Sequence, residues 1–435
     1  MRKCSLALAL LVLLLVLSVL CLLPACSKQN PGVFAWQKVS ETPISPDVKS
    51  IQLELTSQKW QDIIWKHRLT LLVPEKLTHP ETAWLLITGS GKGEMETMLA
   101  SGLTSLAGSI CALLFDVPNQ PLFKGAEGSK PEGMVEDALI AYTFVKFMES
   151  KDQTWPLLLP MRESAIRAMD AVQEFAKKEL KTEVKQFVVT GGSKRGWATW
   201  LTGAADKRVA AIAPAVYDNL NLAAQMKRQK EAFGEYSEMI EDYTRLGLPD
   251  LIESEEGKQI AALVDPYTFR AQLTMPKLII IGSNDPYWPL DASNLYWDDL
   301  VGEKYLLRVP NKGHDVGDLE RLVNGELAFL LQAQGRLQFP KLEWSFEEKP
   351  EGVTLSTASV PMPQDIHVWV AAAPTMDFRK STWESKPMSK QDGKWVYTLA
   401  KPASGYAALF GEAVYPFMEE RKYFLSTQVR IIPTK

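Results

Sequence analysis

The sequence predicts an α/β fold, with a mostly parallel sheet, a helical cap insertion and a small C-terminal all-β module. Between residues 51 and 334, short runs of Val, Ile and Leu alternate with longer amphipathic stretches, which is typical of strands and helices built around one parallel sheet. After residue 338 the apolar runs are short and separated by Pro and Gly, which indicates β-structure alone. The composition is that of a globular protein, since 46% of the 435 residues are hydrophobic and 23% are charged.

The charge balance and the scarcity of His and Cys exclude two classes of function. The 48 Lys and Arg are matched by 52 Asp and Glu, so the net charge is −4 and no nucleic-acid partner is expected. Only four His and four Cys are present, and their spacing is not that of a zinc site. We therefore expect neither a metal nor a cofactor.

The N-terminus has the layout of a secretory signal. Arg2 and Lys3 precede an apolar run over residues 6–23, so residues 1–25 are predicted to be a signal peptide. The protein is then expected to be exported to the bacterial cell envelope, on the periplasmic side or the surface. An uncleaved membrane anchor is the alternative for a run of this length.

Cys26 is the candidate lipidation site. It ends a Leu-Pro-Ala-Cys stretch that resembles a bacterial lipobox, although Pro24 departs from the small or aliphatic residue usual there. A lipid on Cys26 predicts attachment to a membrane, and a plain signal peptide stays open as the alternative. Residues 26–46, rich in Pro, Ser, Lys and Gln, are expected to be a tether.

The α/β half is predicted over residues 47–337. Its strands are expected at 51–55, 69–73, 84–88, 110–115, 187–190, 209–213, 278–281 and 305–309. The first two of these form a pair that flanks turn-bearing residues 57–66. Its helices are expected at 134–149, 162–180, 194–204 and 317–331.

One connection in this half is too long for a loop. The segment between the strands at 209–213 and 278–281 contains two charged helical stretches, at 220–242 and 252–263. An insertion of this size above a sheet edge usually forms a lid. We expect a helical cap at about 219–263 that partly covers Ser193.

The C-terminal module is predicted over residues 338–435. Short β-type runs lie at 353–356, 366–372, 395–399 and 406–412, with turn-forming residues between them. This pattern favours a β-sandwich-like module.

Ser193 has the setting of a nucleophile. The buried run at 187–190 leads into Gly-Gly-Ser-Lys-Arg-Gly and then into a helical stretch, as in the nucleophile elbow of α/β-hydrolases. Such a turn lifts the Ser hydroxyl clear of the sheet and aims the next backbone N–H at the oxygen that becomes negative in acyl transfer. Arg195 stands where the second Gly is usual, and Gly196 follows it. A phosphate-binding turn and a Ser that only caps the helix are the alternatives.

Asp285 and His314 are the candidate partners of Ser193. Asp285 follows the strand at 278–281, and His314 follows the strand at 305–309. All three residues are thus delivered to one edge of the sheet, in the chain order Ser, Asp, His of α/β-hydrolases. A His on an exposed loop with no such role is the alternative reading of His314.

A Gly-rich loop after the strand at 84–88 is the candidate for the remaining oxyanion donors. Ser90 and Gly91 lie in it, and in the hydrolase layout this loop adds a backbone N–H to the one after the nucleophile, here that of Lys194. The loop lacks the full Gly-x-x-x-x-Gly-Lys-Ser/Thr pattern, so a nucleotide site is not expected.

Six short stretches carry a family resemblance: GSKRGWATWL at 192–201, APAVYDNLN at 213–221, GSNDPYW at 282–288, PNQP at 118–121, EDAL at 136–139 and PM at 160–161. They resemble the PhoPQ-activated pathogenicity-related family, over most of the chain from about Trp36. The resemblance implies an exported protein with an α/β-hydrolase-like fold and leaves the substrate open. The elbow is also similar to that of glucuronoyl esterases, which implies that Lys194, the basic residue after the nucleophile, helps to stabilise the oxyanion.

These patterns together predict a serine hydrolase of the cell envelope. Ser193 would attack an ester or amide, His314 would shuttle the proton and Asp285 would hold the imidazole. Arg195 is expected to be paired with a carboxylate, and Lys194 to point toward the pocket. A non-catalytic envelope protein that uses the fold for binding, and a scaffold whose β module binds, are the rivals. The substrate, a small molecule or a peptide, stays open, as does the choice between esterase and peptidase.

Overall fold

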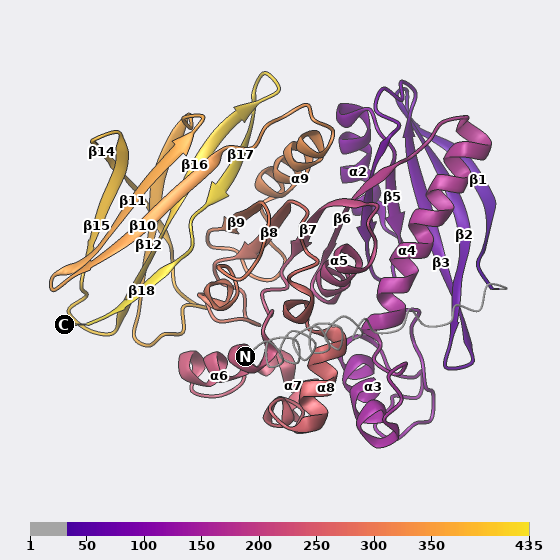
Figure 1. Ribbon diagram of the computed structural model, residues 1–435, viewed down its shortest axis with the longest axis horizontal. Coiled ribbons are helices and arrows are strands. Elements are labelled where there is room, and N and C mark those ends of the chain that lie inside the picture. The colour runs from indigo at the N-terminus through magenta and orange to yellow at the C-terminus, as the bar shows by residue number, and fades with distance from the viewer. Residues whose placement is uncertain (1–32, 435) are drawn as a thin grey trace, which may run out of the picture.

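The computed structural model describes residues 33–434 (Figure 1). Over these residues the largest sheet has nine strands in the order β1-β2-β3-β5-β4-β6-β7-β8-β9. Their bounds are β1 Ala35–Ser45, β2 Val48–Trp60, β3 Ile63–Pro74, β4 Thr82–Ile87, β5 Cys111–Leu114, β6 Gln186–Gly192, β7 Val209–Ala215, β8 Lys277–Gly282 and β9 Lys304–Val309. In this sheet order, the pairs β1-β2, β2-β3 and β3-β5 are antiparallel, and every pair from β5-β4 to β8-β9 is parallel. The predicted α/β fold with a mostly parallel sheet is confirmed.

Helices cover both faces of this sheet (Figure 1). Their bounds are α2 Glu94–Ala107, α3 Glu136–Ser150, α4 Leu158–Phe175, α5 Lys194–Ala205 and α9 Leu319–Ala333. The strands are apolar on both sides: in β6, Val188 packs into the core under α2 and α9, and Val189 into the core under α4 and α5. Helix α2 was not predicted, because Gly102 and the exposed Met95 and Met98 interrupt its apolar stripe.

The predicted tether is wrong for its second half. Residues 26–46 were expected to be unstructured, but Ala35–Ser45 is the edge strand β1 and pairs with β2. Most of β1 is exposed, so its sequence lacks the apolar alternation of a half-buried strand. Trp36 holds it in place, since its ring packs edge-on against Phe175 at 6.0 Å. The signal peptide predicted at 1–25 and the lipidation site lie outside the described residues.

The turn expected within residues 57–66 is confirmed, but it is shorter than that segment. Strands β2 and β3 run through that segment and are joined by Gln61 and Asp62 alone, at φ 48° and 60°. Two-residue turns with positive φ at both positions match the twist of a hairpin, and Asn-Gly or Asp-Gly usually signals them. Gln-Asp gives no such signal.

The cap is helical, as predicted, but it is broken into short pieces. The larger ones are α6 Leu222–Phe233 and α8 Glu255–Val264; η2 Glu238–Ile240, α7 Glu241–Thr244, η3 Pro249–Leu251 and η4 Pro266–Phe269 are single turns. The expected continuous helix at 220–242 ends at Gly234, whose φ of 84° terminates α6. The pieces lie together with α3 beyond the ends of the parallel strands (Figure 1).

The C-terminal module consists of two antiparallel sheets, β10-β11-β15-β14 and β13-β12-β16-β17, with β18 beside β16. Its strands are β10 Lys341–Lys349, β11 Gly352–Val360, β12 Asp365–Ala373, β13 Glu384–Pro387, β14 Ser389–Gln391, β15 Lys394–Ala400, β16 Tyr406–Phe417, β17 Arg421–Ser426 and β18 Arg430–Pro433. The predicted all-β module is confirmed. Some strands of the module were not predicted, because they are short or carry mainly exposed polar residues. The strands that were missed are β10, β13, β14, β17 and β18.

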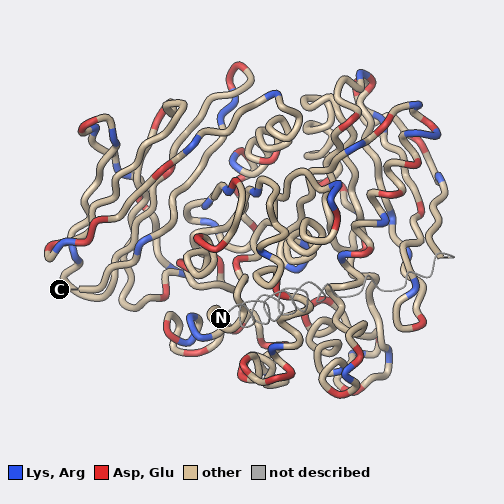
Figure 2. The backbone as a smooth tube through the Cα atoms, in the orientation of Figure 1, with Lys and Arg blue, Asp and Glu red and all other residues tan. Residues whose placement is uncertain are grey.

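The module is joined to the α/β half by buried contacts. One apolar core runs from β8, β9 and α9 into the sandwich. The Arg308 backbone N–H donates to Ser426 Oγ at 3.0 Å, and Glu412, which is fully buried, pairs with Arg321 of α9 at 2.9 Å. Acidic and basic residues are interspersed along both parts (Figure 2). Within residues 33–434, none of the helices combines the length and the apolar character that crossing a bilayer requires.

A buried carboxyl group lies beneath β6. Glu326 of α9 is 5% exposed, and it accepts hydrogen bonds from Thr190 Oγ1 at 2.7 Å and Trp84 Nε1 at 3.1 Å. Burial raises the pKa of Glu326 from 4.5 to about 7, against the opposing effect of these two donors.

This pKa predicts a pH-dependent stability. Between the unfolded and folded pKa values of Glu326, the unfolded chain is ionised there and the folded chain is protonated. The free energy of unfolding therefore falls as pH rises through that window, by up to about 3 kcal/mol from this group. Glu326→Gln should remove this contribution. Urea unfolding of the wild-type protein and of Glu326→Gln at pH 5, 6, 7 and 8 measures the contribution. Other buried acids titrate equally in both proteins, so the difference between their free energies of unfolding reports Glu326. If that difference does not change with pH, the assignment is contradicted.

Candidate active site

Ser193 lies on a sharp turn between β6 and α5, with φ 58° and ψ −128°. A non-glycine residue in this region is strained, and it is held there by close backbone packing. A Cβ on Gly191 would lie 2.8 Å from the carbonyl oxygen of Arg195, and a Cβ on Gly196 would lie 2.7 Å from that of Ala215. The prediction that Gly196 gives the relief that a Gly at position 195 usually gives is confirmed.

The three predicted site residues come together. His314 Nε2 lies 2.8 Å from Ser193 Oγ, and His314 Nδ1 lies 2.8 Å from Asp285 Oδ2. Ser193 follows the carboxyl end of β6, Asp285 that of β8 and His314 that of β9. In α/β sheets, ligands bind at this edge. The expected hydrogen-bond distances are confirmed.

Asp285 is fixed by its neighbours. Its Oδ1 accepts the backbone N–H of Tyr287 at 2.9 Å, which leaves Oδ2 for His314. The Tyr287 ring packs on the imidazole, with ring centroids 4.1 Å apart. A second buried carboxyl, Asp218, follows β7 but accepts from the hydroxyl of Tyr296 at 2.7 Å instead. Asp285, and not Asp218, is therefore the carboxyl group that orients His314.

Arg195 is paired, as the sequence predicted. Its Nη1 and Nη2 each lie 2.7 Å from an oxygen of Glu136, and its Nε donates to the Val117 carbonyl at 2.6 Å. The guanidinium also lies close against Gly89, where a Cβ would be 2.7 Å from Nη2. Burial raises the pKa of Glu136, but Arg195 and Lys194 outweigh it and lower that pKa to about 2. The side chain thus ties the elbow to two neighbouring loops.

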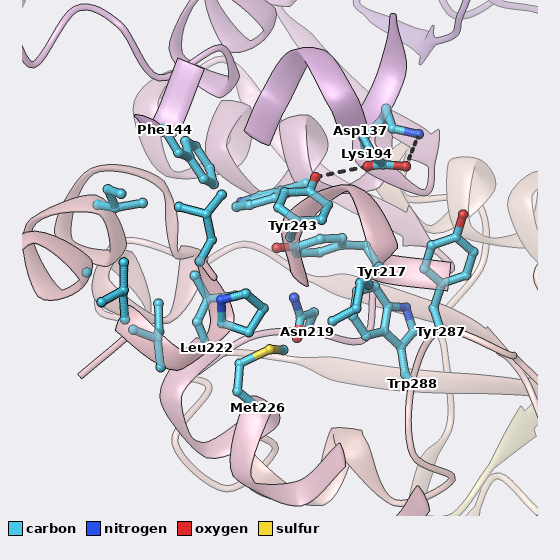
Figure 3. Close-up of a pocket in the computed structure, with 18 of the residues that line it drawn as sticks. Asp137, Phe144, Lys194, Tyr217, Asn219, Leu222, Met226, Tyr243, Tyr287 and Trp288 are labelled. Atoms are coloured by element: carbon cyan, nitrogen blue, oxygen red, sulfur yellow. Dashed lines mark hydrogen bonds and ion pairs between the residues drawn. The ribbon is translucent and has the colours of Figure 1, made fainter. Parts of the chain in front are cut away.

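Lys194 lies in the wall of a cavity next to Ser193, with its ammonium paired. Nζ lies 2.8 Å from Glu136 Oε2 and 3.1 Å from Asp137 Oδ2, and the side chain is 9% exposed. Asp137 also accepts from the hydroxyl of Tyr243 in the cap, at 2.9 Å (Figure 3). The sequence did not predict that two carboxylates hold this ammonium. Within residues 33–434, no three or more His, Cys, Asp or Glu side chains form a group that could hold a metal ion.

The candidate oxyanion donors lie on two elements. Lys194 is the first residue of α5, so its backbone N–H belongs to the helix terminus, where donors have no intrahelical partner. Ser90 and Gly91 are exposed on the loop after β4, the neighbour of β6 in the sheet. Neither is among the residues that line the cavity. Of these candidate donors, Lys194 thus lies next to Ser193. The role of Ser90 and Gly91 as oxyanion donors stays a prediction.

The cavity beside Ser193 has a volume of about 90 Å³. Cap residues line it, among them Ile260 of α8. Met226 of α6 and Phe144 of α3 lie on its wall as well (Figure 3). The predicted cap therefore shares a cavity with Ser193, which confirms that it partly covers this residue.

Several residues of the site were not found from the sequence. They are Glu136, Asp137, Tyr217, Asn219, Tyr243 and Tyr287. They lie near Ser193 because segments distant in sequence come together there, which local pattern does not reveal. The stretches at 136–139, 213–221 and 282–288 that carried the family resemblance contain five of them, all but Tyr243, and this was the available signal.

Comparison with known proteins places the chain in a family. A family model described as PhoPQ-activated pathogenicity-related protein matches residues 25–379. Autocrine proliferation repressor protein A of Dictyostelium discoideum is 31% identical over 423 residues, which cover 88% of this chain and 84% of that protein.

Solved structures with the same fold include two acetyl xylan esterases. The enzyme from Paenibacillus sp. R4 has a TM-score of 0.50 at 16% identity and covers 71% of this chain and 90% of its own. Acetyl xylan esterase 1 from Thermoanaerobacterium sp. JW/SL YS485 has a TM-score of 0.48 at 15% identity, over 70% of this chain and 90% of its own. At 16% identity the likeness to the Paenibacillus enzyme shows the α/β-hydrolase fold alone. The match over residues 25–379 shows more: the chain belongs to the PhoPQ-activated pathogenicity-related protein family.

Proposed function

We propose that the protein is a serine hydrolase that cleaves an ester or amide. The observation that carries the proposal is the relay in which His314 lies 2.8 Å from both Ser193 Oγ and Asp285 Oδ2. A hydroxyl on a strained turn, a base within hydrogen-bond reach and a carboxylate behind the base are the parts that nucleophilic acyl transfer needs.

In the first step, Ser193 Oγ attacks the carbonyl carbon of the substrate while His314 Nε2 takes the hydroxyl proton. The new C–O bond gives a tetrahedral intermediate, and Asp285 stabilises the imidazolium. The backbone N–H of Lys194, at the N-terminus of α5, stabilises the negative oxygen. When the bond to the leaving group breaks, Nε2 returns the proton to the departing oxygen or nitrogen.

In the second step, water attacks the acyl-Ser193 ester. His314 Nε2 takes one proton of that water and then gives it to Ser193 Oγ, which restores the free hydroxyl and releases the acid. The sequence of proton transfers needs no group beyond these residues and water.

A substrate screen tests this proposal. The purified protein is assayed against p-nitrophenyl esters, sugar esters, aminoacyl amides and short peptides, with and without a fluorophosphonate. We expect at least one class to be hydrolysed, and the fluorophosphonate to stop that turnover. Absence of turnover on every class, together with no reaction with the fluorophosphonate, would favour a binding protein on a hydrolase fold.

The two basic residues of the elbow are expected to differ in their effects. Lys194, Arg195, Glu136 and Asp137 form a neutral cluster. Lys194→Ala leaves one net negative charge where the oxyanion forms, so kcat should fall by about ten- to a thousand-fold with little change in melting temperature. Arg195→Ala should chiefly lower the melting temperature, because it removes the two hydrogen bonds to Glu136 and the one to the Val117 carbonyl and leaves Glu136 with Lys194 alone.

Steady-state kinetics and thermal unfolding of both variants measure this difference. Adding Asp137→Asn to Lys194→Ala restores the neutral cluster and should recover part of the lost kcat. Full turnover in Lys194→Ala would show that the backbone N–H of Lys194 is its only contribution.

We also propose that the protein acts in the cell envelope, attached to its membrane by lipid on Cys26. The basic start, the apolar run at 6–23 and the position of Cys26 directly after Ala25 support this.

A further inference from the structure

The cavity beside Ser193 lies on the acyl side of the bond to be cleaved. His314 must reach the leaving group to protonate it, so the leaving group lies next to Nε2. Ser193 and Lys194 line the cavity, and His314 is not among its lining residues. The group in the cavity is therefore the one that stays bonded to the carbonyl carbon.

The cavity is apolar and has no free charge. Its walls are formed mainly by aliphatic and aromatic side chains, such as Phe144, Met226 and Ile260. Its two charged groups, Lys194 and Asp137, are paired with each other at 3.1 Å. An acyl group that carries a charge would find no partner here, and desolvating it would be unfavourable.

Two buried polar atoms in the cavity wall have no hydrogen-bond partner among the described residues. They are the hydroxyl of Tyr217 and Oδ1 of Asn219, whose residues are 4% and 6% exposed and line the cavity (Figure 3). The Tyr217 ring is held in place, because it stacks on Trp197 with centroids 4.8 Å apart. A buried donor or acceptor left unpaired is unfavourable by about 1–3 kcal/mol, so a ligand that pairs with these atoms gains specificity.

The size of the cavity limits the length of the acyl chain. A water-sized group occupies about 30 Å³, and the cavity holds about 90 Å³. Bonded groups lie closer together than separate waters do, so about four of them fit beyond the carbonyl carbon, which itself lies at Ser193.

We propose that the cavity binds an uncharged, short acyl group of about four carbons that carries one hydroxyl or amide, which pairs with Tyr217 and Asn219. This rests on the proposed function of Ser193. The apolar walls select the chain, the volume limits its length, and the two polar atoms select the substituent.

Hydrolysis of p-nitrophenyl esters tests the proposal on the full chain. The series is acetate, butyrate, 3-hydroxybutyrate, 4-hydroxybutyrate, hemisuccinate and octanoate. We expect kcat/KM for butyrate to exceed that for acetate by about tenfold, from two more buried methylenes. At least one hydroxybutyrate should exceed butyrate by about ten- to a hundred-fold, and hemisuccinate and octanoate should be poor.

Variants separate the polar contact from a structural role. Asn219→Leu and Tyr217→Phe should lower the ratio of kcat/KM between the better hydroxybutyrate and butyrate to about one. Butyrate serves as the reference within each variant, so a general loss of activity does not affect the ratio.

A second pair of variants tests the volume. Met226→Ala should move the preferred chain from butyrate toward hexanoate or octanoate. Met239, which is 39% exposed on the cap and outside the cavity lining, is the matched control, and Met239→Ala should not move it.

The outcomes distinguish this proposal from the one on which it rests. If esters are hydrolysed by Ser193 but neither hydroxybutyrate is preferred, or a charged or long acyl group is, the acyl proposal is overturned and the hydrolase stands. If no ester is hydrolysed and Ser193 does not react with a fluorophosphonate, the hydrolase proposal itself is overturned.

Discussion

Replacing Ser193 with Ala is expected to lower kcat by about 10⁴- to 10⁶-fold while leaving the fold intact. The substitution removes the oxygen that forms the acyl-enzyme, and the remaining site can only bind substrate and polarise its carbonyl. The Ala side chain fits the turn, since Gly191 and Gly196 rather than the hydroxyl make room for it. Steady-state hydrolysis of the best ester or amide measures the loss, and circular dichroism and thermal unfolding check the fold.

The chain offers a matched control in a second Ser–His pair. Ser57 Oγ lies 2.9 Å from His67 Nε2, both buried, but His67 Nδ1 contacts the backbone carbonyls of Phe115 and Asp116 instead of a carboxylate. Burial lowers the pKa of His67 to about 4, so this imidazole stays neutral and structural. Ser57→Ala should leave kcat unchanged. Equal losses in Ser57→Ala and Ser193→Ala would mean that the assay reports folding and not chemistry.

Asp285→Asn is expected to lower kcat by about 10³- to 10⁴-fold. Asp285 accepts from His314 Nδ1 and so keeps Nε2 free to take the Ser193 proton. The Asn amide can donate to Nδ1, which would place the ring proton on Nε2 and block proton uptake. Steady-state kinetics measure the loss of kcat. The pH profile of kcat/KM detects the change in the protonation of the His314 imidazole.

Asp218→Asn is the control for this variant. Burial raises the pKa of Asp218 to about 7, and its partner is Tyr296 and not His314. An amide there replaces a carboxyl group that is partly protonated at neutral pH, so kcat should fall by less than about tenfold. A larger loss in Asp218→Asn than in Asp285→Asn would contradict the assignment of Asp285 to His314.

The core of the site could be predicted because parallel sheets bring the ends of their strands to one edge. Ser193, Asp285 and His314 each follow a buried run of Val, Ile, Leu or Phe, so their placement depended only on recognising β6, β8 and β9. The small number of His residues made His314 stand out. The displaced Gly196 could be interpreted before the structure because the elbow needs a glycine wherever the backbone of β7 approaches it.

The surroundings of the site could not be predicted in the same way. Glu136 and Asp137 begin α3, and only folding brings them to Lys194 and Arg195. Their role depends on loop paths between β5 and α3 that have no periodic pattern. For the same reason the unpartnered polar atoms of the cavity became visible only when the cap was in place.

Exposed elements at the edges of the fold could not be predicted from the hydrophobic pattern. β1 shows little alternation because its two faces are both mostly exposed, and the hairpin of β2 and β3 turns on Gln61 and Asp62 without a glycine. Hydrophobic periodicity reports burial on one face, so elements that bury little are the ones it misses.

The position of covalent labelling by a fluorophosphonate tests the central claim most directly. The full chain is treated with the probe, digested, and the modified peptide is sequenced by mass spectrometry, beside Ser193→Ala and His314→Asn. We predict one label per chain, on Ser193, no label in Ser193→Ala, and strongly slowed labelling in His314→Asn, because the hydroxyl then lacks its base. Labelling that persists in Ser193→Ala, or that maps to another residue of the wild-type chain, would contradict the assignment of Ser193 as the nucleophile.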